Sequence, residues 1–471
     1  MKRRLDLVMP GTMLATIEPG KQAGPGAGMP FSVAPGKGGM ARAQEVSATR
    51  SVAFDMLRGV LARRRTLDRE MTSHNGYRRL PARDRAFARL IVSTVLRRTG
   101  QIDAVLDAFL ERPLPRSGAA VQDILRLATA EMLFLGVGAH ASVDSAVSLT
   151  TSRGLERFSG LVNAVLRRVA REGGAALARI PETRNLPDWL LASWIDRFGT
   201  EDAERAVAAS LAIPPLDISV GTDAERWARE LDATVLPTGT LRRKFGGAVS
   251  DLPGYADGAW WVQDAAAALP VRLFGDLDGR SALDLCAAPG GKTAQLVAAG
   301  ATVTAVDRAQ SRLDRLRRNL ARLGMKARTL VADGTTWRTG RLFDCVLVDA
   351  PCLATGTIRR NPDSLHNRHP GQLEGLIALQ DALLDAAGEL VRPGGRIVYC
   401  TCSLQSEEGE DRIEALLGRA PGLRRVPVSA GEIGGLDAAV TGAGDMQTMP
   451  FHLAGHGGID GFFAARLERE V

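Results

Sequence analysis

The sequence has few cysteines and no long apolar segment. It contains no run of about 18 apolar residues, so we expect no membrane-spanning helix. It begins Met-Lys-Arg-Arg, but Asp6, Pro10 and Gly11 interrupt the apolar segment that a secretory signal peptide would require. The five cysteines all lie between residues 286 and 402, a clustering that favours a reducing compartment and chemical roles over disulfide bonds. We therefore expect a cytoplasmic protein.

Two common nucleotide-binding motifs are also incomplete. The dinucleotide-binding motif Gly-x-Gly-x-x-Gly does not occur. Residues 291–293 (Gly-Lys-Thr) match the end of a phosphate-binding loop, and residues 342–349 are similar to the acidic strand of ATPases that use this loop. However, Cys286 occupies the position of the first glycine, and its Cβ atom obstructs a loop that must wrap around phosphate. An ATPase is therefore a minor alternative.

Positive charge is concentrated in the first part of the chain. Residues 1–175 carry 27 Lys and Arg against 15 Asp and Glu, whereas the remainder carries 33 against 38. An excess of this size favours a polyanionic partner, by default RNA or DNA. A solvated basic surface without a partner is the alternative.

The residue pattern predicts a leader and three further regions. Residues 1–44 are rich in Gly and Pro, which predicts a disordered leader. Over residues 45–175 apolar residues recur at helical spacing without strand-like alternation, which predicts an all-helical domain. The pattern over residues 176–260 predicts a linker region made of helices and a small α/β insert. In residues 261–471 strand-like and helical segments alternate, which predicts an α/β fold with a doubly wound parallel sheet.

The segment Ser281–Thr293 is the centre of the predicted α/β domain. A short apolar strand leads into a Pro-Gly-Gly turn and then a helix, an arrangement that presents backbone N–H groups to a small polar ligand. Further acids and cysteines follow predicted strands, and strand ends meet at the ligand-binding edge of such a sheet. These residues are Asp284, Asp307, Asp333, Asp349, Cys352 and Cys402.

The acids indicate a nucleoside ligand that carries positive charge. Asp307 lies 16 residues after Gly291, close to the spacing at which an acid accepts hydrogen bonds from ribose hydroxyls, and Asp333 is placed to meet the base. Several carboxylates would repel the phosphates of ATP but suit a sulfonium such as S-adenosylmethionine. Each acid taken singly is equally consistent with a solvated strand end or a helix cap.

Four phrases in the second half carry a family resemblance: D-L-C-A-A-P-G-G-K-T, D-A-P-C, R-R-N-P-D and Y-C-T-C-S. They resemble the RNA (cytosine-5)-methyltransferases of the RsmB/Sun (or Nol1/Nop2/Sun) family. Three helical phrases resemble the RNA-binding fold of NusB: R-A-F-A-R-L-I-V-S-T-V-L-R-R, A-E-M-L-F-L and G-L-V-N-A-V-L-R-R-V-A-R-E. The resemblance implies a Rossmann-like methyltransferase domain behind a NusB-like domain, S-adenosylmethionine as methyl donor, and small-subunit (16S-type) rRNA as substrate.

The resemblance also implies roles for individual residues. In the family the Thr-Cys-Ser cysteine attacks the base, which gives Cys402, and Cys352 then assists release; the residues alone leave either cysteine open as nucleophile. Our own hypothesis from the chemistry is that Asp349, in protonated form, hydrogen-bonds the cytosine's N3 and amino group and stabilises the charge of the adduct. The expected donor site comprises Cys286, Ala287, Ala288, Pro289, Gly290, Gly291, Lys292, Asp307, Asp333 and Asp349.

The chemistry of cytosine agrees with these roles. Carbon 5 is a poor nucleophile, and addition of a thiolate at C6 makes it reactive, which splits one difficult step into two easier ones. A paired base must first be flipped out, and we expect Arg359, Arg360 and the basic helix 311–322 to hold RNA phosphates nearby. Cys286, Cys345 and Cys400 are expected in the core, and no Cys/His set has zinc spacing, so we expect no metal. An RNA-binding protein without activity is the remaining alternative.

Overall fold

The structure is a computed structural model that describes residues 39–471 except residue 245. Residues 1–38 of the predicted leader lie outside the described residues, and helix α1 begins at Gly39. Residues 38–471 form one unit, in which the helical part, the linker and the α/β part contact one another. The predicted boundaries at residues 175 and 260 remain predictions. Among the described residues, no helix is both long and apolar enough to cross a bilayer.

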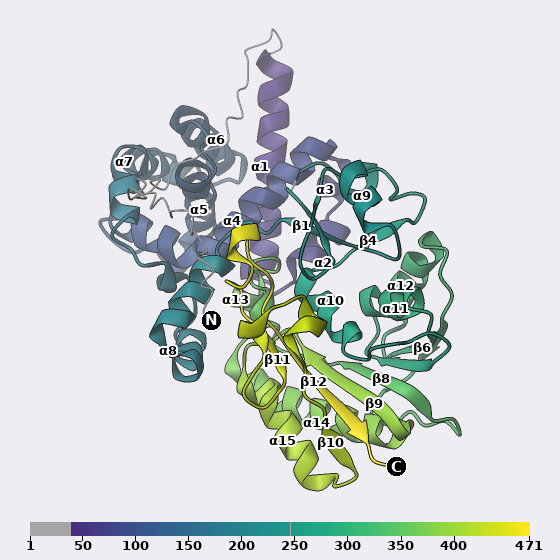
Figure 1. Ribbon diagram of the computed structural model, residues 1–471. Helices are drawn as coiled ribbons and strands as arrows, with labels where there is room; N and C mark the ends of the chain where they lie inside the picture. The colour runs from purple at the N-terminus through teal and green to yellow at the C-terminus, as the bar shows by residue number, and fades with distance from the viewer. Residues whose placement is uncertain (1–38, 245) are drawn as a thin grey trace, which may run out of the picture. The chain divides into compact units, whose positions relative to one another are not determined.

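The first part is built from helices around a single apolar core (Figure 1). Leu57, Ile91, Leu125 and Val165 are among its fully or almost fully buried residues. They come from four different helices whose apolar residues recur on one face, as the sequence predicts. The helices are α1 (Gly39–Leu61), α2 (Leu67–Ser73), α3 (Asn75–Arg79), α4 (Ala82–Asp107), α5 (Ala119–Phe134), α6 (Ala139–Ser152) and α7 (Ser159–Leu177).

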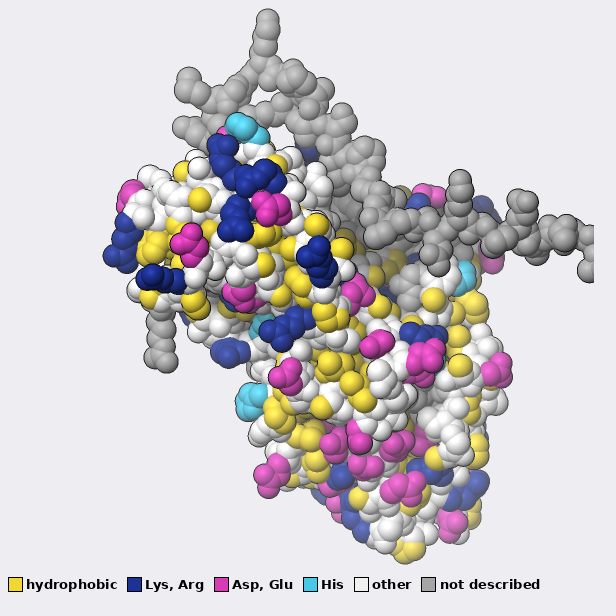
Figure 2. Space-filling model, turned by 90° about the vertical axis from the view of Figure 1, so that its left-hand side faces the viewer, with side chains coloured by type: hydrophobic (Ala, Val, Ile, Leu, Met, Phe, Trp, Pro, Cys, Tyr) yellow, Lys and Arg dark blue, Asp and Glu magenta, His cyan; other side chains and the backbone are white. Residues whose placement is uncertain are grey.

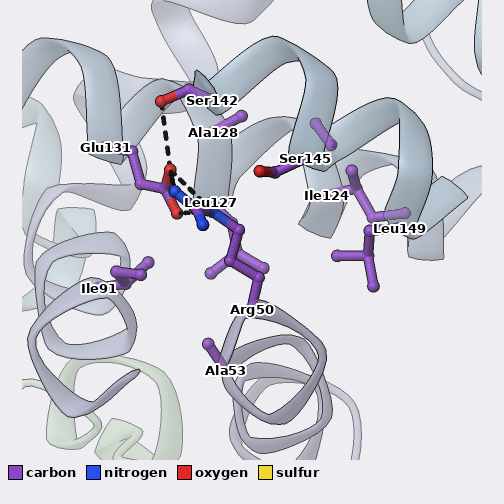
Figure 3. A pocket seen from close by; sticks show the side chains of 11 residues that line it. Arg50, Ala53, Ile91, Ile124, Leu127, Ala128, Glu131, Ser142, Ser145 and Leu149 are labelled. Atoms are coloured by element: carbon purple, nitrogen blue, oxygen red, sulfur yellow. Dashed lines mark hydrogen bonds and ion pairs between the residues drawn. The ribbon is translucent and has the colours of Figure 1, made fainter. Parts of the chain in front are cut away.

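A buried ion pair joins three of these helices (Figure 3). Arg50 of α1 donates to both carboxylate oxygens of Glu131 of α5 at 2.8 Å, and the Ser142 hydroxyl of α6 donates to the same carboxylate at 3.1 Å. Ala53, Ile91 and other apolar side chains surround the pair. Because a buried charge is tolerated only when it is paired and hydrogen-bonded, this group fixes the helices relative to one another. We assign it a structural role.

The linker region contains a long helix and a small antiparallel sheet. Helix α8 (Asp188–Ser210) packs Trp194 into a separate apolar cluster. The sheet follows, in the strand order β2-β3-β1-β4, and is completed by helix α9 (Ala224–Glu230). Its strands are β1 (Leu216–Val220), β2 (Thr234–Val235), β3 (Leu241–Arg243) and β4 (Trp260–Val262). This sheet lies where the sequence predicts a small α/β insert.

The second part is a mixed sheet in the order β10-β12-β9-β8-β5-β6-β7, with β11 paired to β12. Strands β9, β8, β5, β6 and β7 are parallel, and β12 runs antiparallel to β9. The strands are β5 (Ser281–Leu285), β6 (Thr302–Asp307), β7 (Arg328–Val331), β8 (Phe343–Asp349), β9 (Val391–Thr401), β10 (Leu423–Arg425), β11 (Met446–Thr448) and β12 (Phe462–Arg469). The predicted α/β class is confirmed, and the last strand, β12, joins the sheet antiparallel to β9.

Helices cover both faces of this sheet (Figure 1). One apolar cluster joins it to α10 (Ala265–Arg272) and α11 (Gly291–Ala298), and another joins it to α14 (Leu373–Leu390) and α15 (Glu410–Arg419). Strand β5 is buried throughout because both of its faces are covered. The strand order reverses at β5, between β6 and β8, and ligands of such sheets bind at the strand ends beside this reversal.

Candidate active site

The turn after β5 has a backbone shape that depends on glycine. Gly290 has φ +104°, and a Cβ atom there would lie 2.9 Å from Cγ of Leu316. Cys286, which begins the turn, also has a positive φ of +64°. Helix α11 starts immediately afterwards at Gly291, so its N-terminus opens at the end of the sheet. The predicted strand, turn and helix are therefore confirmed.

Neighbouring elements hold this turn from two sides. The Ala287 N–H donates to the Val306 carbonyl at 3.0 Å, and the Ala288 N–H donates to Oδ2 of Asp307 at 3.2 Å. From helix α12 (Gln310–Arg322), Arg312 donates to the Ala288 carbonyl at 2.6 Å and Asn319 donates to the Pro289 carbonyl at 2.9 Å. The basic helix predicted at 311–322 thus packs against the turn, and two of its polar side chains stabilise it.

The predicted acids have different surroundings. Asp307 is 2% exposed and accepts hydrogen bonds from two backbone amides, those of Ala288 and Ala309. Asp333, after β7, is exposed, and the hydroxyl and amide of Thr335 lower the pKa of its carboxyl. Asp284, inside β5, is fully buried, and burial raises its pKa to about 7 although the Thr293 hydroxyl donates to it at 2.5 Å. Its second oxygen has no hydrogen-bond partner.

Lys292 forms a contact that the sequence did not predict. Its ammonium lies 2.8 Å from Oδ2 of Asp349, at the end of β8, and 4.8 Å from the centre of the Phe462 ring. Burial alone would lower the pKa of Lys292, but Asp349 and the thiols of Cys400 and Cys402 together raise it. Lys292 therefore stays protonated and places a positive charge beside the cysteines. Its side chain points to Asp349, at the end of the neighbouring strand β8.

Cys352 and Cys402 lie together although 50 residues separate them. Their sulfur atoms are 3.5 Å apart, because they follow the adjacent parallel strands β8 and β9. Cys352 is 8% exposed and Cys402 is more accessible. The hydrogen bond to Cys402, together with burial, raises the pKa of the Cys352 thiol well above its usual range. Cys352 therefore stays a thiol and can donate to the sulfur of Cys402.

Glu408 supports the loop that carries Cys352, and no sequence signal marked it for this role. Its buried carboxylate accepts from the Leu353 N–H at 3.0 Å and from the Gln380 side chain at 3.1 Å. Gln380 also donates to the Pro351 carbonyl at 2.8 Å, so both neighbours of Cys352 are held. Burial raises the pKa of Glu408 despite these donors.

The other three cysteines lie in different environments. Cys345 and Cys400 are buried in β8 and β9, as predicted, and burial raises the pKa of both thiols. Cys286 is half-buried in the turn rather than in a strand, and burial raises its pKa to about 12. Across residues 39–471, leaving out 245, no group of three or more His, Cys, Asp or Glu is arranged to hold a metal ion. That the protein uses no metal stays a prediction.

Arg359 is buried and Arg360, whose side chain is 21% exposed, is half-buried, and both are paired with carboxylates of the protein. Arg359 has a 1% exposed side chain and pairs with Asp460 at 2.8 Å, and Arg360 pairs with Asp460 at 3.2 Å and with Asp264. The prediction that Arg359 and Arg360 hold RNA phosphates is therefore wrong, because carboxylates inside the protein already neutralise both guanidinium groups. With Arg242 and Asp217, which pair at 2.7 Å, they form what we call the arginine–aspartate cluster: Arg242, Arg359, Arg360, Asp217, Asp264 and Asp460.

Charge on the surface is distributed unevenly. Figure 2 shows Lys and Arg gathered over the upper part of one face, where Figure 1 places α5, α6 and α7. Asp and Glu are more frequent over the lower part, where α14 and α15 lie. Arg157, Arg167 and Arg171 are exposed arginines on or beside α7. The positive excess of the first part of the sequence therefore includes exposed charge.

Comparisons with known proteins agree on one family. A model described as 16S rRNA methyltransferase RsmB/F matches residues 275–468, and the NusB family model matches residues 47–171. Ribosomal RNA small subunit methyltransferase B of Xanthomonas campestris pv. campestris is 36% identical over 441 residues, which cover 89% of the chain and 97% of that protein. Its namesake in Cronobacter sakazakii is 33% identical over 82% of the chain and 90% of that protein.

Two solved structures share the fold. The crystal structure of PH0851 superimposes with a TM-score of 0.72 at 23% identity, over 90% of this chain and 99% of that one. The crystal structure of NSun6 from Pyrococcus horikoshii with SFG superimposes with a TM-score of 0.52 at 20% identity. The match covers 60% of this chain and 98% of that one. Both the resemblance and the fold class expected from the sequence are confirmed.

Proposed function

Because the chain belongs to the RsmB family of 16S rRNA methyltransferases, we propose that it methylates carbon 5 of a cytosine in small-subunit rRNA. The methyl donor in this proposal is S-adenosylmethionine, whose sulfonium supplies an electrophilic methyl group. One observation carries the proposal: two thiols 3.5 Å apart at the ends of adjacent strands, beside the Lys292–Asp349 pair. A site with two such cysteines fits addition to a pyrimidine ring better than direct transfer to an amino or hydroxyl group.

The turn after β5 fits the proposed donor. Gly290 allows the positive φ of the turn and its close packing against Leu316, and helix α11 begins directly after it, so the N–H groups of the helix N-terminus lie at the strand end. The unpartnered oxygen of Asp284 is a buried acceptor at this strand end. Asp307 and Asp333, at the ends of β6 and β7, remain the proposed acids for ribose and base, with residues 286–292 forming the rest of the site.

Cys402 is the proposed nucleophile. Its thiolate attacks C6, a sulfur–carbon bond forms, and the ring electrons make C5 nucleophilic enough to take the methyl group. The methyl–sulfur bond of the donor breaks in this step and leaves S-adenosylhomocysteine. Water then accepts the proton from C5, and the sulfur–carbon bond to Cys402 breaks with its electron pair returning to the sulfur, which restores the aromatic ring. Cys352 stays protonated, so it can hydrogen-bond the attacking sulfur and later assist release of the product.

Asp349 and Lys292 complete the proposed site. Asp349 has a side chain that is 35% exposed. In the proposal its protonated carboxyl donates to the cytosine's N3 and accepts from the amino group, which stabilises the charge of the adduct. The Lys292 ammonium holds Oδ2 of Asp349 and stabilises negative charge on the nearby sulfur atoms. A cytosine reaches these groups only when it is unstacked from its neighbours.

We infer that the helical part binds RNA. Its exposed arginines, which include Arg157, Arg167 and Arg171, suit contacts with phosphates, and such contacts give affinity without reading sequence. Its match to the NusB family supports the same role.

The test is transfer of a labelled methyl group from S-adenosylmethionine to a 16S rRNA transcript, with nucleoside digestion of the product. Wild type should yield 5-methylcytidine, Cys402→Ala should yield none, and Cys345→Ala serves as a matched control because its sulfur lies in the core. Methylation of another base or position would contradict the cytosine-5 proposal. Full activity of Cys402→Ala would contradict the assigned nucleophile.

A further inference from the structure

The segments that carry the two cysteines are tied to each other. The Gly356 N–H donates to the Cys402 carbonyl at 3.0 Å, and the Leu404 N–H donates to the Thr355 hydroxyl at 2.9 Å. The Thr355 hydroxyl also lies 3.1 Å from that of Ser403. The distance between the two sulfur atoms therefore depends on what holds residues 351–360 and residues 402–405.

Helix α4 of the helical part holds the first segment. The buried guanidinium of Arg97 donates to the Arg359 carbonyl at 2.7 Å, and burial lowers the pKa of Arg97 to about 10, which leaves it charged at neutral pH. Further along the segment, helix α13 (Ser364–Asn367) packs against α4 (Figure 1). There the His366 ring lies 2.8 Å from the Leu96 carbonyl, and the Asn367 side chain donates to the Arg65 carbonyl at 3.1 Å.

Helix α8 of the linker region holds the second segment in the same way. Arg197 donates to the Leu404 carbonyl at 2.8 Å, two residues after Cys402. Gln405 donates to the Ser193 hydroxyl at 2.7 Å and accepts from the Trp194 indole at 3.3 Å. Each cysteine segment thus has a backbone carbonyl bonded to an arginine from outside the α/β part.

We propose that α4 and α8 are positioning elements for the cysteine pair, with Arg97 and Arg197 as positioning residues that act through the carbonyls of Arg359 and Leu404. This role goes beyond RNA binding by the helical part and presupposes the methyl transfer proposed above. Displacement of a reacting group by about 1 Å can slow a reaction by about two orders of magnitude, so small movements of either segment affect the rate.

The experiment uses the full chain and measures single-turnover methyl transfer to 16S rRNA transcript at saturating S-adenosylmethionine. Arg97→Ala and Arg197→Ala should each slow transfer about tenfold, the effect expected for one lost charge-assisted hydrogen bond. Arg97→Lys, which keeps one donor, should recover part of the rate. RNA affinity and affinity for S-adenosylhomocysteine should stay within about twofold of wild type, since neither arginine contacts the donor turn or the exposed face.

The matched control is Arg98→Ala. Arg98 is the next residue of α4, but it pairs with Glu182 at 2.8 Å and with Gln101 at 2.9 Å, neither of which belongs to a cysteine segment, so its loss should leave the rate unchanged. If Arg97→Ala does not fold, Arg197→Ala and Arg97→Lys decide the question. The positioning role would be overturned if these variants transferred methyl groups at the wild-type rate, or if Arg98→Ala slowed transfer equally. It would also be overturned if the variants lost only RNA affinity. A wild type that transfers no methyl group to C5 would instead overturn the proposed function, and the positioning role with it.

Discussion

Two groups of charged and ionisable side chains flank the segment after Cys352, and they differ in access to solvent. The arginine–aspartate cluster is closed: every member lies in an ion pair, and the carboxylates of Asp217, Asp264 and Asp460 are at most 5% exposed. At the cysteine pair, Asp349 is 35% exposed and Cys402 is accessible. The closed cluster stabilises the fold, whereas the open group can act on a substrate.

The largest effect we predict is on stability, from breaking the closed cluster. Asp264→Ala removes a carboxylate shared by Arg359 and Arg360 and leaves buried positive charge uncompensated. We expect the free energy of unfolding to fall by about 3–5 kcal/mol, measured by urea denaturation. Asp257→Ala, at an exposed position of the same region, is the control and should change little. A loss of less than about 1 kcal/mol in Asp264→Ala would show that the cluster is not structural.

The next effect is on activity, from breaking the open group. Lys292→Met removes the charge beside Asp349 and the cysteines, so we expect the methyl-transfer rate to fall by about 100-fold. The melting temperature should change much less than in Asp264→Ala, because Asp349 remains able to reach solvent. Lys326→Met, at an exposed lysine, is the control. A rate within about threefold of wild type would remove Lys292 from the mechanism.

A third effect concerns pH. The pKa of Asp284 is raised by burial to about 7 in the folded state, above its unfolded value of 3.8, so the folded protein binds this proton more tightly. Its contribution to stability is therefore present at low pH and is lost as the pH rises from about 4 to about 7. Asp284→Asn keeps an acceptor for Thr293 and should reduce the loss of stability between pH 5 and pH 8 by about 2 kcal/mol. Identical pH profiles would contradict the assignment.

The smallest effect should come from an exposed ion pair. Arg315 of α12 lies 3.1 Å from Asp68 of α2, and both side chains are more than half exposed. Because exposed pairs are screened by water and salt, Arg315→Ala should cost at most about 0.5 kcal/mol of unfolding free energy. If Arg315→Ala lowered the unfolding free energy as much as Asp264→Ala, burial would not explain why ion pairs differ in their contribution to stability.

Features set by local sequence could be predicted, whereas most contacts between residues far apart in the chain could not. The strand, turn and helix at 281–298 follow from local composition, and the strand ends place Cys352 beside Cys402 because β8 and β9 are neighbours. The partners of Arg359 and Arg360 could not be foreseen, since Asp264 and Asp460 lie about a hundred residues away in opposite directions along the chain. Glu408 was missed for a similar reason: its contacts to Leu353 and Gln380 exist only after folding.

The most direct test of the central claim is a search for a covalent protein–RNA complex after incubation with S-adenosylmethionine and 16S rRNA transcript. If Cys402 attacks C6 and Cys352 assists release, Cys352→Ala should accumulate a complex that survives denaturing electrophoresis, and Cys352→Ala/Cys402→Ala should form none. The mass of a digested complex should place the RNA fragment on the peptide containing Cys402. A stable complex that forms without Cys402, or rapid turnover by Cys402→Ala, would contradict this account.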